Sequence, residues 1–171
     1  SIGVEVDPYT GYNSSSIPAI LNEFSAMAFR LGHTQIGPVL WRLDANGDTI
    51  SFGNVELKDA FFQPQKVPNE GGIEPILRGL AAHHQQKADS KINPALRNFL
   101  FGPPGAGGMD LASINIMRGR ERGLPDYNTM RQYYSLSHNT TMEDITNDQA
   151  MQDSILHMYG NTDDIDPWVG M

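Results

Sequence analysis

The chain has 171 residues, and 39% of them are hydrophobic, which is enough apolar material for one folded core. Its 12 Lys and Arg residues and 20 Asp and Glu residues give a net charge of −8 without any basic cluster, so binding to nucleic acid or to an anionic membrane surface is not expected. The absence of cysteine excludes disulfides and thiolate metal sites from these residues, and no apolar run approaches the ~20 residues that span a bilayer.

The first predicted element is a helix that begins near Ser16 and ends near Thr34. Ser16 is a suitable N-cap, and Pro18 suits the first turn. Apolar side chains then recur every three or four residues, the spacing of a helix face packed on a core. Arg30 and His33 lie three residues apart and are expected to share another face. The apolar stripe comprises Ile17, Ile20, Phe24, Met27 and Leu31.

A β-hairpin is predicted next. Pro38 ends the helical pattern, and the apolar runs 39–43 and 49–52 flank an Asn-Gly turn, which is a strong hairpin signal. The alternating Asp and Asn residues of segment 44–48 also hint at a calcium loop. However, the glycine stands at the fourth loop position instead of the sixth, and Val55 replaces the expected bidentate Glu. We therefore interpret this segment as a turn.

Two helices are predicted after the hairpin, the second of which has His83 and His84 at its polar end. Asn54 is the expected N-cap of the first, which runs from Val55 to Phe62. The second follows Gly72, and its apolar residues at helical spacing are expected to face the core. Those residues are Ile73, Ile76, Leu77 and Leu80.

The rest of the chain is also predicted to be helical, in short segments separated by glycine and proline. Asp110 is the expected N-cap of the helix over residues 111–122, and Gly123 ends that helix. The fold class is therefore mainly α with one short β-hairpin. The expected helices cover residues 94–101, 111–122, 128–136 and 148–159.

A second pair of polar residues has the same three-residue spacing as Arg30 and His33. Asn115 lies on an apolar helix face, and Arg118 follows it three residues later. A buried amide without a partner costs about 1–3 kcal/mol, so Asn115 is expected to bind a group on a facing element. If the two helices pack together, the amide oxygen accepts the Nδ1–H of His33 and leaves Nε2 free to bind a metal. Arg30 and Arg118 then suit the carboxylates of a cofactor.

An imidazole, an amide and two guanidinium groups match an iron porphyrin, which carries one iron and two propionates. Two other interpretations stay open at this point. A histidine near a helix end is most often a surface or capping residue. The arginines also have ordinary candidate partners in Glu23, Asp59 and Asp110.

Five successive sequence blocks resemble those of the animal-type haem peroxidases, the peroxidase–cyclooxygenase superfamily. The resemblance implies the helical haem-peroxidase fold, with residues 1–171 forming the proximal-side part of a single catalytic domain. The residues that commonly lie on the distal side of the haem, and the family's calcium loop, have no counterpart in this chain. The distal part is therefore expected to come from upstream in the same polypeptide or from a second chain. The matching blocks are 29–34, 71–80, 110–120, 123–128 and 165–170.

The resemblance also assigns roles to residues. His33 corresponds to the proximal ligand of the iron in haem b, and Asn115 to the asparagine hydrogen-bonded to it. Arg30 and Arg118 correspond to arginines near the haem propionates. The implied function is a haem-dependent peroxidase that reduces hydrogen peroxide while oxidising a small donor such as a halide or a phenol. No catalytic residue of the distal side is assigned in this chain.

Two departures from the family pattern bear on this expectation. Members that oxygenate fatty acids resemble one another in a radical-forming tyrosine three residues before the proximal histidine, where this chain has Arg30; this favours a peroxidase over a dioxygenase. Residues 120–123 read Arg-Glu-Arg-Gly where the family usually has Arg-Asp-His-Gly, which predicts altered local pairing. A fatty-acid dioxygenase and a truncated, non-enzymatic haem-binding or interaction fragment remain the alternatives. The resemblance favours a secreted or extracellular location, and sequons at Asn13 and Asn139 permit glycosylation there.

Overall fold

The computed structural model describes residues 8–61, 63–100, 102–103 and 105–171. These residues are mainly helical, with one two-stranded antiparallel sheet, which confirms the predicted fold class. No helix in the described part of the chain combines the length and hydropathy that a bilayer crossing requires. The elements up to residue 97 are α1 (Asn22–Ala26), the 3₁₀ helix η1 (Ala28–Gln35), β1 (Val39–Leu40), β2 (Val55–Glu56), α2 (Leu57–Ala60), α3 (Lys66–Asn69), α4 (Glu74–Ala82) and α5 (Pro94–Arg97).

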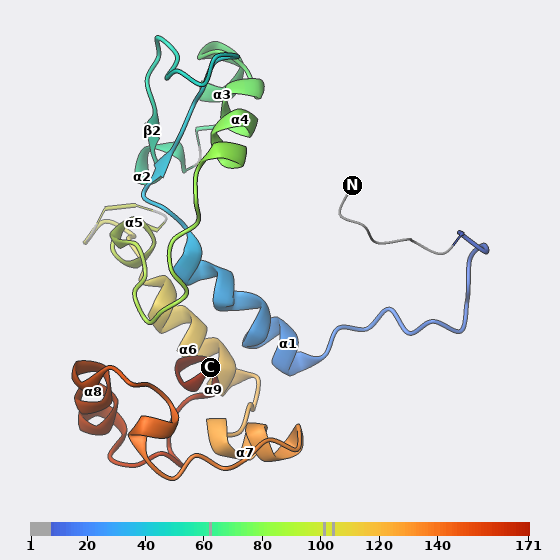
Figure 1. The fold of residues 1–171 in the computed structure, drawn as a ribbon, viewed down its shortest axis with the longest axis vertical. Coiled ribbons are helices and arrows are strands. Elements are labelled where there is room, and N and C mark those ends of the chain that lie inside the picture. The colour runs from blue at the N-terminus through green and yellow to red at the C-terminus, as the bar shows by residue number, and fades with distance from the viewer. Residues whose placement is uncertain (1–7, 62, 101, 104) are drawn as a thin grey trace.

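The remaining helices surround the C-terminus. In Figure 1 the hairpin with α3 and α4 forms one end of the molecule, and α7 and α8 lie at the other end. The blue segment of α1 and η1 and the yellow α6 run through the middle, between these ends. These helices are α6 (Leu111–Glu121), α7 (Tyr127–Tyr133), the 3₁₀ helix η2 (Met142–Asp144), α8 (Gln149–Tyr159) and α9 (Pro167–Gly170).

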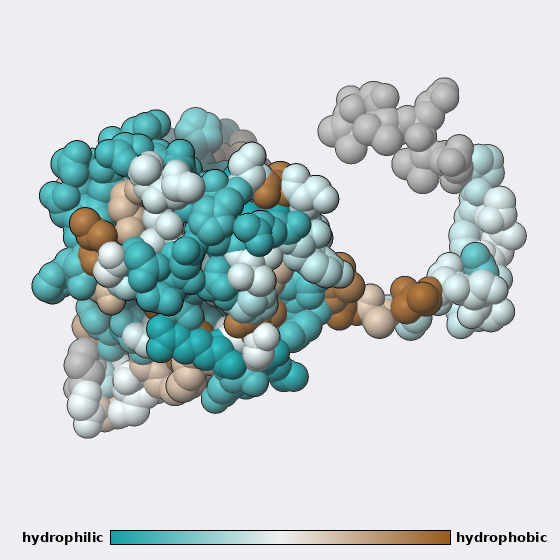
Figure 2. Space-filling view, turned by 90° about the horizontal axis from the view of Figure 1, so that it is seen from below, coloured by the Kyte–Doolittle hydropathy of each residue, from teal (hydrophilic) through white to brown (hydrophobic). Residues whose placement is uncertain are grey.

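The predicted start of the first helix at Ser16 is wrong. The helix begins at Asn22 after the extended residue Leu21, and from Ala28 it continues as a 3₁₀ helix. Ile17 is 84% exposed and Ile20 is 69% exposed, so this part of the predicted apolar stripe has no surface to pack against. Short helices depend on such packing for stability. Figures 1 and 2 show residues 8–21 projecting away from the body of the molecule.

The hairpin is confirmed, but its strands pair differently from the prediction. β1 pairs with β2 through Val39↔Glu56 and Leu40↔Val55, and only the bridge Leu43↔Thr49 uses the segment 49–52. Between these pairings the second strand bends around the buried guanidinium of Arg42, which donates to the carbonyls of Phe52 and Gly53 at 2.7 and 2.6 Å.

The turn of the hairpin is confirmed as well. The Asp44 Oδ1 accepts hydrogen bonds from the backbone N–H groups of Asn46 and Asp48 at 2.8 and 3.0 Å, which closes the Asn-Gly turn. The predicted cap at Asn54 is wrong, because its Oδ1 accepts from the N–H of Arg42 at 2.9 Å. The helix that follows begins only at Leu57 and ends at Ala60. Phe62, the predicted end, lies outside the described residues.

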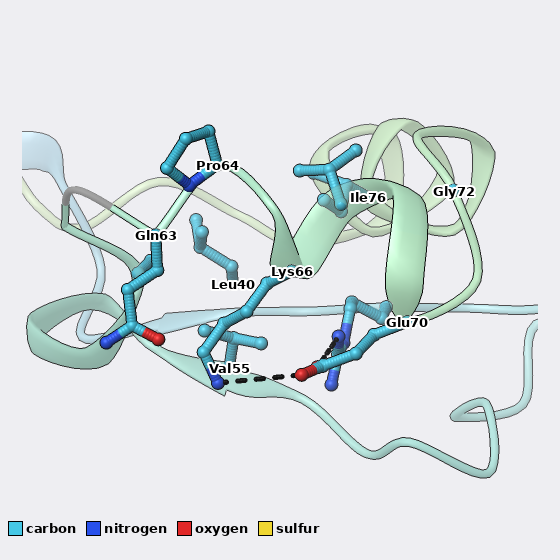
Figure 3. Close-up of a pocket in the computed structure, with 11 residues that line it drawn as sticks. Leu40, Val55, Gln63, Pro64, Lys66, Glu70, Gly72 and Ile76 are labelled. Atoms are coloured by element: carbon cyan, nitrogen blue, oxygen red, sulfur yellow. Dashed lines mark hydrogen bonds and ion pairs between the residues drawn. The ribbon is translucent and has the colours of Figure 1, made fainter.

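A cavity of about 160 Å³ lies between the hairpin and helices α3 and α4, and Figure 3 shows residues that line it. Leu40, Val55 and Ile76 contribute to its apolar wall. Arg42 closes one side through an ion pair with Glu70 at 2.7 Å, and Lys66 lies 3.7 Å from the other carboxylate oxygen. The Arg42–Glu70 pair holds the hairpin against α3, and the Lys66–Glu70 contact lies within the α3 segment itself.

The predicted core face of α4 is wrong. Ile73 and Leu77 are each 54% exposed and Leu80 is 61% exposed, whereas Pro75 and Gly79 are the buried residues of this helix. Small residues face the hairpin because the helix approaches the backbone of Trp41 so closely that a Cβ on Gly79 would overlap its carbonyl oxygen. Three of the four predicted core side chains consequently point outward, whereas Ile76 is partly buried and lines the cavity beside the hairpin.

The later helices begin within one residue of their predicted starts. Asp110 accepts from the N–H groups of Ala112 and Ser113 at the start of α6, and Asp148 accepts from Met151 in α8. Gly160 ends α8 in the left-handed conformation, with φ of 79°. Two ends differ from the prediction: α5 stops at Arg97 and α7 at Tyr133. Phe101, the predicted end of the former, is outside the described residues.

Two small clusters form the core of the described residues. One surrounds Leu57 and Leu96, and the other surrounds Ile155 and Ile165. Between the helices of the second cluster, Arg120 in α6 donates two hydrogen bonds to Asp166, the N-cap of α9, at 2.9 and 2.6 Å. The hydroxyl of Tyr159 at the end of α8 donates to the same carboxylate at 2.8 Å. This carboxylate thus joins three helices.

Candidate functional site

Three of the four predicted site residues meet where the segment of α1 and η1 lies beside α6 (Figure 1). The Asn115 Nδ2 is 3.0 Å from His33 Nδ1, and its Oδ1 accepts a hydrogen bond from Arg30 Nη1 at 3.0 Å. Asn115 is 0% exposed, so the protein itself must satisfy its amide. Arg30 and His33 can both reach one amide because residues three apart eclipse each other in a 3₁₀ helix.

The hydrogen-bond partners fix the orientation of the amide. Arginine only donates hydrogen bonds, so the amide atom that faces Arg30 is the oxygen. The Nδ2 group then donates to His33 Nδ1, which acts as the acceptor. The sequence-based prediction that the amide oxygen accepts the Nδ1–H of His33 is therefore wrong for this structure. The reason is that Arg30 presents a charged donor to that oxygen.

The environment of His33 favours a neutral imidazole. Burial lowers the pKa of His33, the charge of Arg30 lowers it further, and the hydrogen bond with Asn115 offsets these effects only in part. A neutral ring is the form that can bind a metal ion. Among the described residues, nothing hydrogen-bonds to its Nε2. That nitrogen is therefore the one without a partner in the described part of the chain, and in this orientation of the amide it carries the proton of the neutral ring.

The charges around Arg30 are mainly positive. Burial lowers the pKa of Arg30, and the nearby charges of Arg118 and Arg122 lower it further. The guanidinium Nε donates to the carbonyl of Ser25 at 3.0 Å, and in the described part of the chain no carboxylate lies within ion-pair distance of Arg30. Such a group of cations is suited to an anionic ligand.

Arg118 lies near this centre without joining its hydrogen bonds. Its Nη1 pairs with Glu121 at 3.2 Å, one turn along α6, and the side chain is 41% exposed. Arg122 is the residue that the sequence reasoning missed, although it stands in the block 120–123 that departs from the family pattern. Of the three candidate partners named from sequence, Asp59 forms no ion pair with either arginine among the described residues, and the other two are engaged elsewhere. Glu23 accepts from Tyr134, and Asp110 caps α6.

This set of residues fits a prosthetic group that carries both a metal and carboxylates. In the described part of the chain, no three His, Asp or Glu side chains are placed to hold a metal ion by themselves. A metal at His33 would thus need to arrive with most of its ligands already supplied. A porphyrin supplies four ring nitrogens, and its propionates match the positive charge of Arg30, which has no carboxylate partner among the described residues.

In the folded chain, one of the two sequons, at Asn139, is not accessible for glycosylation. The Nδ2 of Asn139 is buried and has no hydrogen-bond partner, and its backbone N–H and carbonyl are both held by Asn128. A glycan on this nitrogen has no path to solvent in the folded chain. Asn13, in contrast, is exposed.

Comparisons with known proteins cover nearly the whole chain. A family model described as animal haem peroxidase matches residues 1–171. Peroxinectin A from Dictyostelium discoideum is 39% identical over 162 residues, covering 95% of this chain and 30% of the relative. Thyroid peroxidase from Sus scrofa is 41% identical over 175 residues, covering 99% of this chain and 19% of the relative. The chain thus spans less than a third of the length of these relatives.

Solved structures give the same fold. Peroxidase A from Dictyostelium discoideum superposes with a TM-score of 0.86 at 38% identity, over 96% of this chain and 31% of that protein. A fatty acid alpha-dioxygenase from Oryza sativa superposes with a TM-score of 0.71 at 23% identity, over 90% of this chain and 27% of that protein. At that identity the second likeness shows a shared fold alone.

Proposed function

The chain belongs to the animal haem peroxidase family, and from this premise we propose that residues 1–171 form the proximal side of the haem site of a peroxidase. The proposed reaction reduces hydrogen peroxide and oxidises a small donor, either a halide or a phenol-like compound. The observation that carries the proposal is the buried amide of Asn115, which joins the imidazole of His33 to the guanidinium of Arg30.

Each residue of the site has a distinct role in this proposal. His33 binds the iron of haem b through Nε2, and Asn115 holds the ring by its Nδ1 side. Arg30 and Arg118 bind the two propionates, which fixes the rotation of the porphyrin in its plane. When bound, the haem supplies the redox-active iron that peroxide reduction requires. The basicity of His33, set by its hydrogen bond with Asn115, tunes the potential of that iron.

The distal half of the reaction needs groups that we do not assign within this chain. Cleavage of a peroxide requires a base to move the proton and a cation to stabilise the leaving charge. We propose that another segment of the natural polypeptide, or a second chain, supplies them, together with any calcium site. Arg30 supports a peroxidase over a fatty-acid dioxygenase, because a guanidinium at this position offers no phenol to form a radical.

The test is substitution of the proposed iron ligand in the natural polypeptide at its full length. We expect His33→Ala to abolish the Soret band and to lower peroxide-dependent donor oxidation by at least about 100-fold, since second-shell changes alone cost 10–100-fold. The matched control is His157→Ala, because His157 is exposed on α8. This variant should keep both the absorbance and the activity.

Three results would contradict the proposal, each in a different way. A Soret band retained in His33→Ala would remove His33 as the ligand. Oxygen uptake with linoleate in the absence of peroxide would indicate a dioxygenase. Haem binding without any peroxide turnover would indicate a non-enzymatic haem protein.

A further inference from the structure

The cavity beside the hairpin lies apart from the residues that are proposed to hold haem. The hairpin, α3 and α4 form one end of the molecule, whereas the segment of α1 and η1 and helix α6 run through its middle (Figure 1). Among the described residues that line the cavity, none is a proposed haem-binding residue. The proposed function therefore gives this cavity no role.

The volume and the wall of the cavity suit a single aromatic ring. The cavity holds about 160 Å³, and an apolar cavity of about 150 Å³ is large enough to bind benzene. Burial of a ring against aliphatic side chains is favourable because it removes apolar surface from water. The apolar residues of the lining are Leu40, Val55, Ala60, Pro64, Val67 and Ile76.

One cation of the lining is available to a ligand. Arg42 is fully engaged, because its guanidinium donates to Glu70 and to two backbone carbonyls. The Lys66 Nζ lies 3.7 Å from Glu70 Oε1, which is beyond hydrogen-bond length. Figure 3 shows the Lys66 side chain extending toward Glu70, and this side chain is 31% exposed. The ammonium group can therefore donate hydrogen bonds to a molecule that enters the cavity.

The charged groups of the lining favour an anion. Two positive residues, Arg42 and Lys66, surround the negative Glu70, so these three side chains together carry one excess positive charge. The hydrogen bond from Arg42 is the main cause that lowers the pKa of Glu70, so this carboxylate is ionised at neutral pH and already has a partner. The excess charge belongs to Lys66.

We propose that this cavity binds an aromatic monocarboxylate with a single ring, such as benzoate. The ring lies between the hairpin and α4, and the carboxylate accepts hydrogen bonds from Lys66. Gln63 also lines the cavity, and its amide makes no hydrogen bond to the described residues, so it is available to the same carboxylate. This binding site does not depend on haem.

The test compares benzoate with benzamide on the natural polypeptide at its full length. The two molecules carry the same ring, and benzamide replaces the charged carboxylate by a neutral amide. Benzoate should shift the NMR signals of ¹³C-labelled methyl groups in Leu40, Val55 and Ile76, which line the cavity. It should also bind about 10-fold more tightly than benzamide, the value of a hydrogen bond to a charged group.

Two substitutions separate the charge of the site from its volume. Lys66→Met keeps most of the aliphatic side chain and removes the charge, so it should weaken benzoate binding about 10-fold and leave benzamide binding unchanged. Ala60→Leu puts a larger side chain into the cavity and should abolish the binding of both molecules. The matched control is Lys58→Met, because Lys58 lies in α2 but does not line the cavity. This variant should bind benzoate as the wild type does.

Three results would overturn the inference. Methyl signals that do not respond to benzoate would show that the cavity is closed or filled in the natural polypeptide. Equal affinities for benzoate and benzamide would show that the site does not recognise a carboxylate. An equal loss of benzoate binding in Lys66→Met and Lys58→Met would show that the general charge of the surface, and not a contact with Lys66, attracts the anion.

Discussion

Asn115 illustrates how a single amide can be recognised from sequence while its orientation cannot. Its position on an apolar helix face predicted a buried amide with a partner across the interface, and it is fully buried against His33. Which amide atom faces the ring depends on a third residue, Arg30, which donates a hydrogen bond to the oxygen. Local sequence cannot resolve this orientation, because Arg30 and His33 lie in η1 and the amide lies in α6, and the two helices meet only in the folded chain.

A second interaction at the residue scale is the set of hydrogen bonds that Asp166 accepts from Arg120 and Tyr159. Burial alone would raise its pKa, but the hydrogen bonds from Arg120 and Tyr159 and the charge of Arg120 outweigh burial, so the pKa of Asp166 is lowered. Burial and the hydrogen bond to Asp166 raise the pKa of Tyr159 to about 12, so the hydroxyl stays protonated and donates. The ionised carboxylate is the form that stabilises the fold.

This gives a prediction for stability against pH. Because the pKa of Asp166 is lower folded than unfolded, its contribution is present above the unfolded pKa of about 3.9 and is lost as pH falls through the folded value. We expect Asp166→Asn to lower the free energy of unfolding by about 2 kcal/mol at pH 7 and by much less near pH 2. Urea unfolding of the natural polypeptide at both pH values measures this difference.

The control for this prediction is Asp48→Asn, because Asp48 is exposed in the hairpin turn. This substitution should change the free energy of unfolding by less than about 0.5 kcal/mol at either pH. An equal loss of stability in Asp166→Asn at pH 7 and at pH 2 would show that the effect does not depend on the ionised carboxylate.

At the scale of elements, close packing of α4 against the hairpin depends on one glycine. A Cβ at Gly79 would overlap the carbonyl oxygen of Trp41, which belongs to the backbone and cannot turn aside. Gly119 in α6 is also helical and buried, but a Cβ there would meet only the side chain of Leu124 at 3.7 Å, an ordinary contact. The two glycines therefore form a matched pair.

We expect opposite effects on stability when each glycine becomes alanine. Gly79→Ala should lower the free energy of unfolding by at least about 2 kcal/mol, since α4 must move away from β1. Gly119→Ala should raise it by up to about 1 kcal/mol, the gain in helix propensity. Chemical denaturation of the natural polypeptide provides both values. Equal effects from the two substitutions would mean that the close approach at Trp41 does not stabilise the fold.

On the scale of the whole molecule, the outward face of α4 carries a cluster of large apolar side chains that are exposed. Ile73, Leu77 and Leu80 lie on this helix with more than half of each side chain exposed. The chain covers 30% of the peroxinectin A sequence and 31% of the solved Peroxidase A chain. We therefore expect other residues of the natural polypeptide, or a second chain, to cover this face.

The test is a charged substitution on that face in the natural polypeptide. If Leu77 is covered, Leu77→Glu should lower the free energy of unfolding by about 2 kcal/mol, the value of a buried leucine side chain. Ala82→Glu at the exposed end of the same helix should change it by less than about 0.5 kcal/mol. A small effect in both variants would mean that the face of α4 stays open to solvent.

The sequence by itself determined the local features, namely the helix caps, the helix ends and the hairpin turn, whose hydrogen bonds join residues close together in the chain. Asp110 caps its helix as predicted, α8 ends at Tyr159 as predicted, and the Asn-Gly turn forms through Asp44. These structures need only hydrogen bonds between near neighbours, so their residues specify them directly. The order of the sequence blocks likewise predicted the family, which the comparisons confirm.

Only the tertiary structure decided which apolar face is buried and which donor holds the shared amide. The stripe from Ile17 to Leu31 and the stripe on α4 have helical spacing, yet most of their side chains remain exposed among the described residues. Spacing shows that a face is apolar, but burial requires a second surface in contact with it. The same reason applies at the site, where Arg30 reaches Asn115 only because α6 lies beside η1.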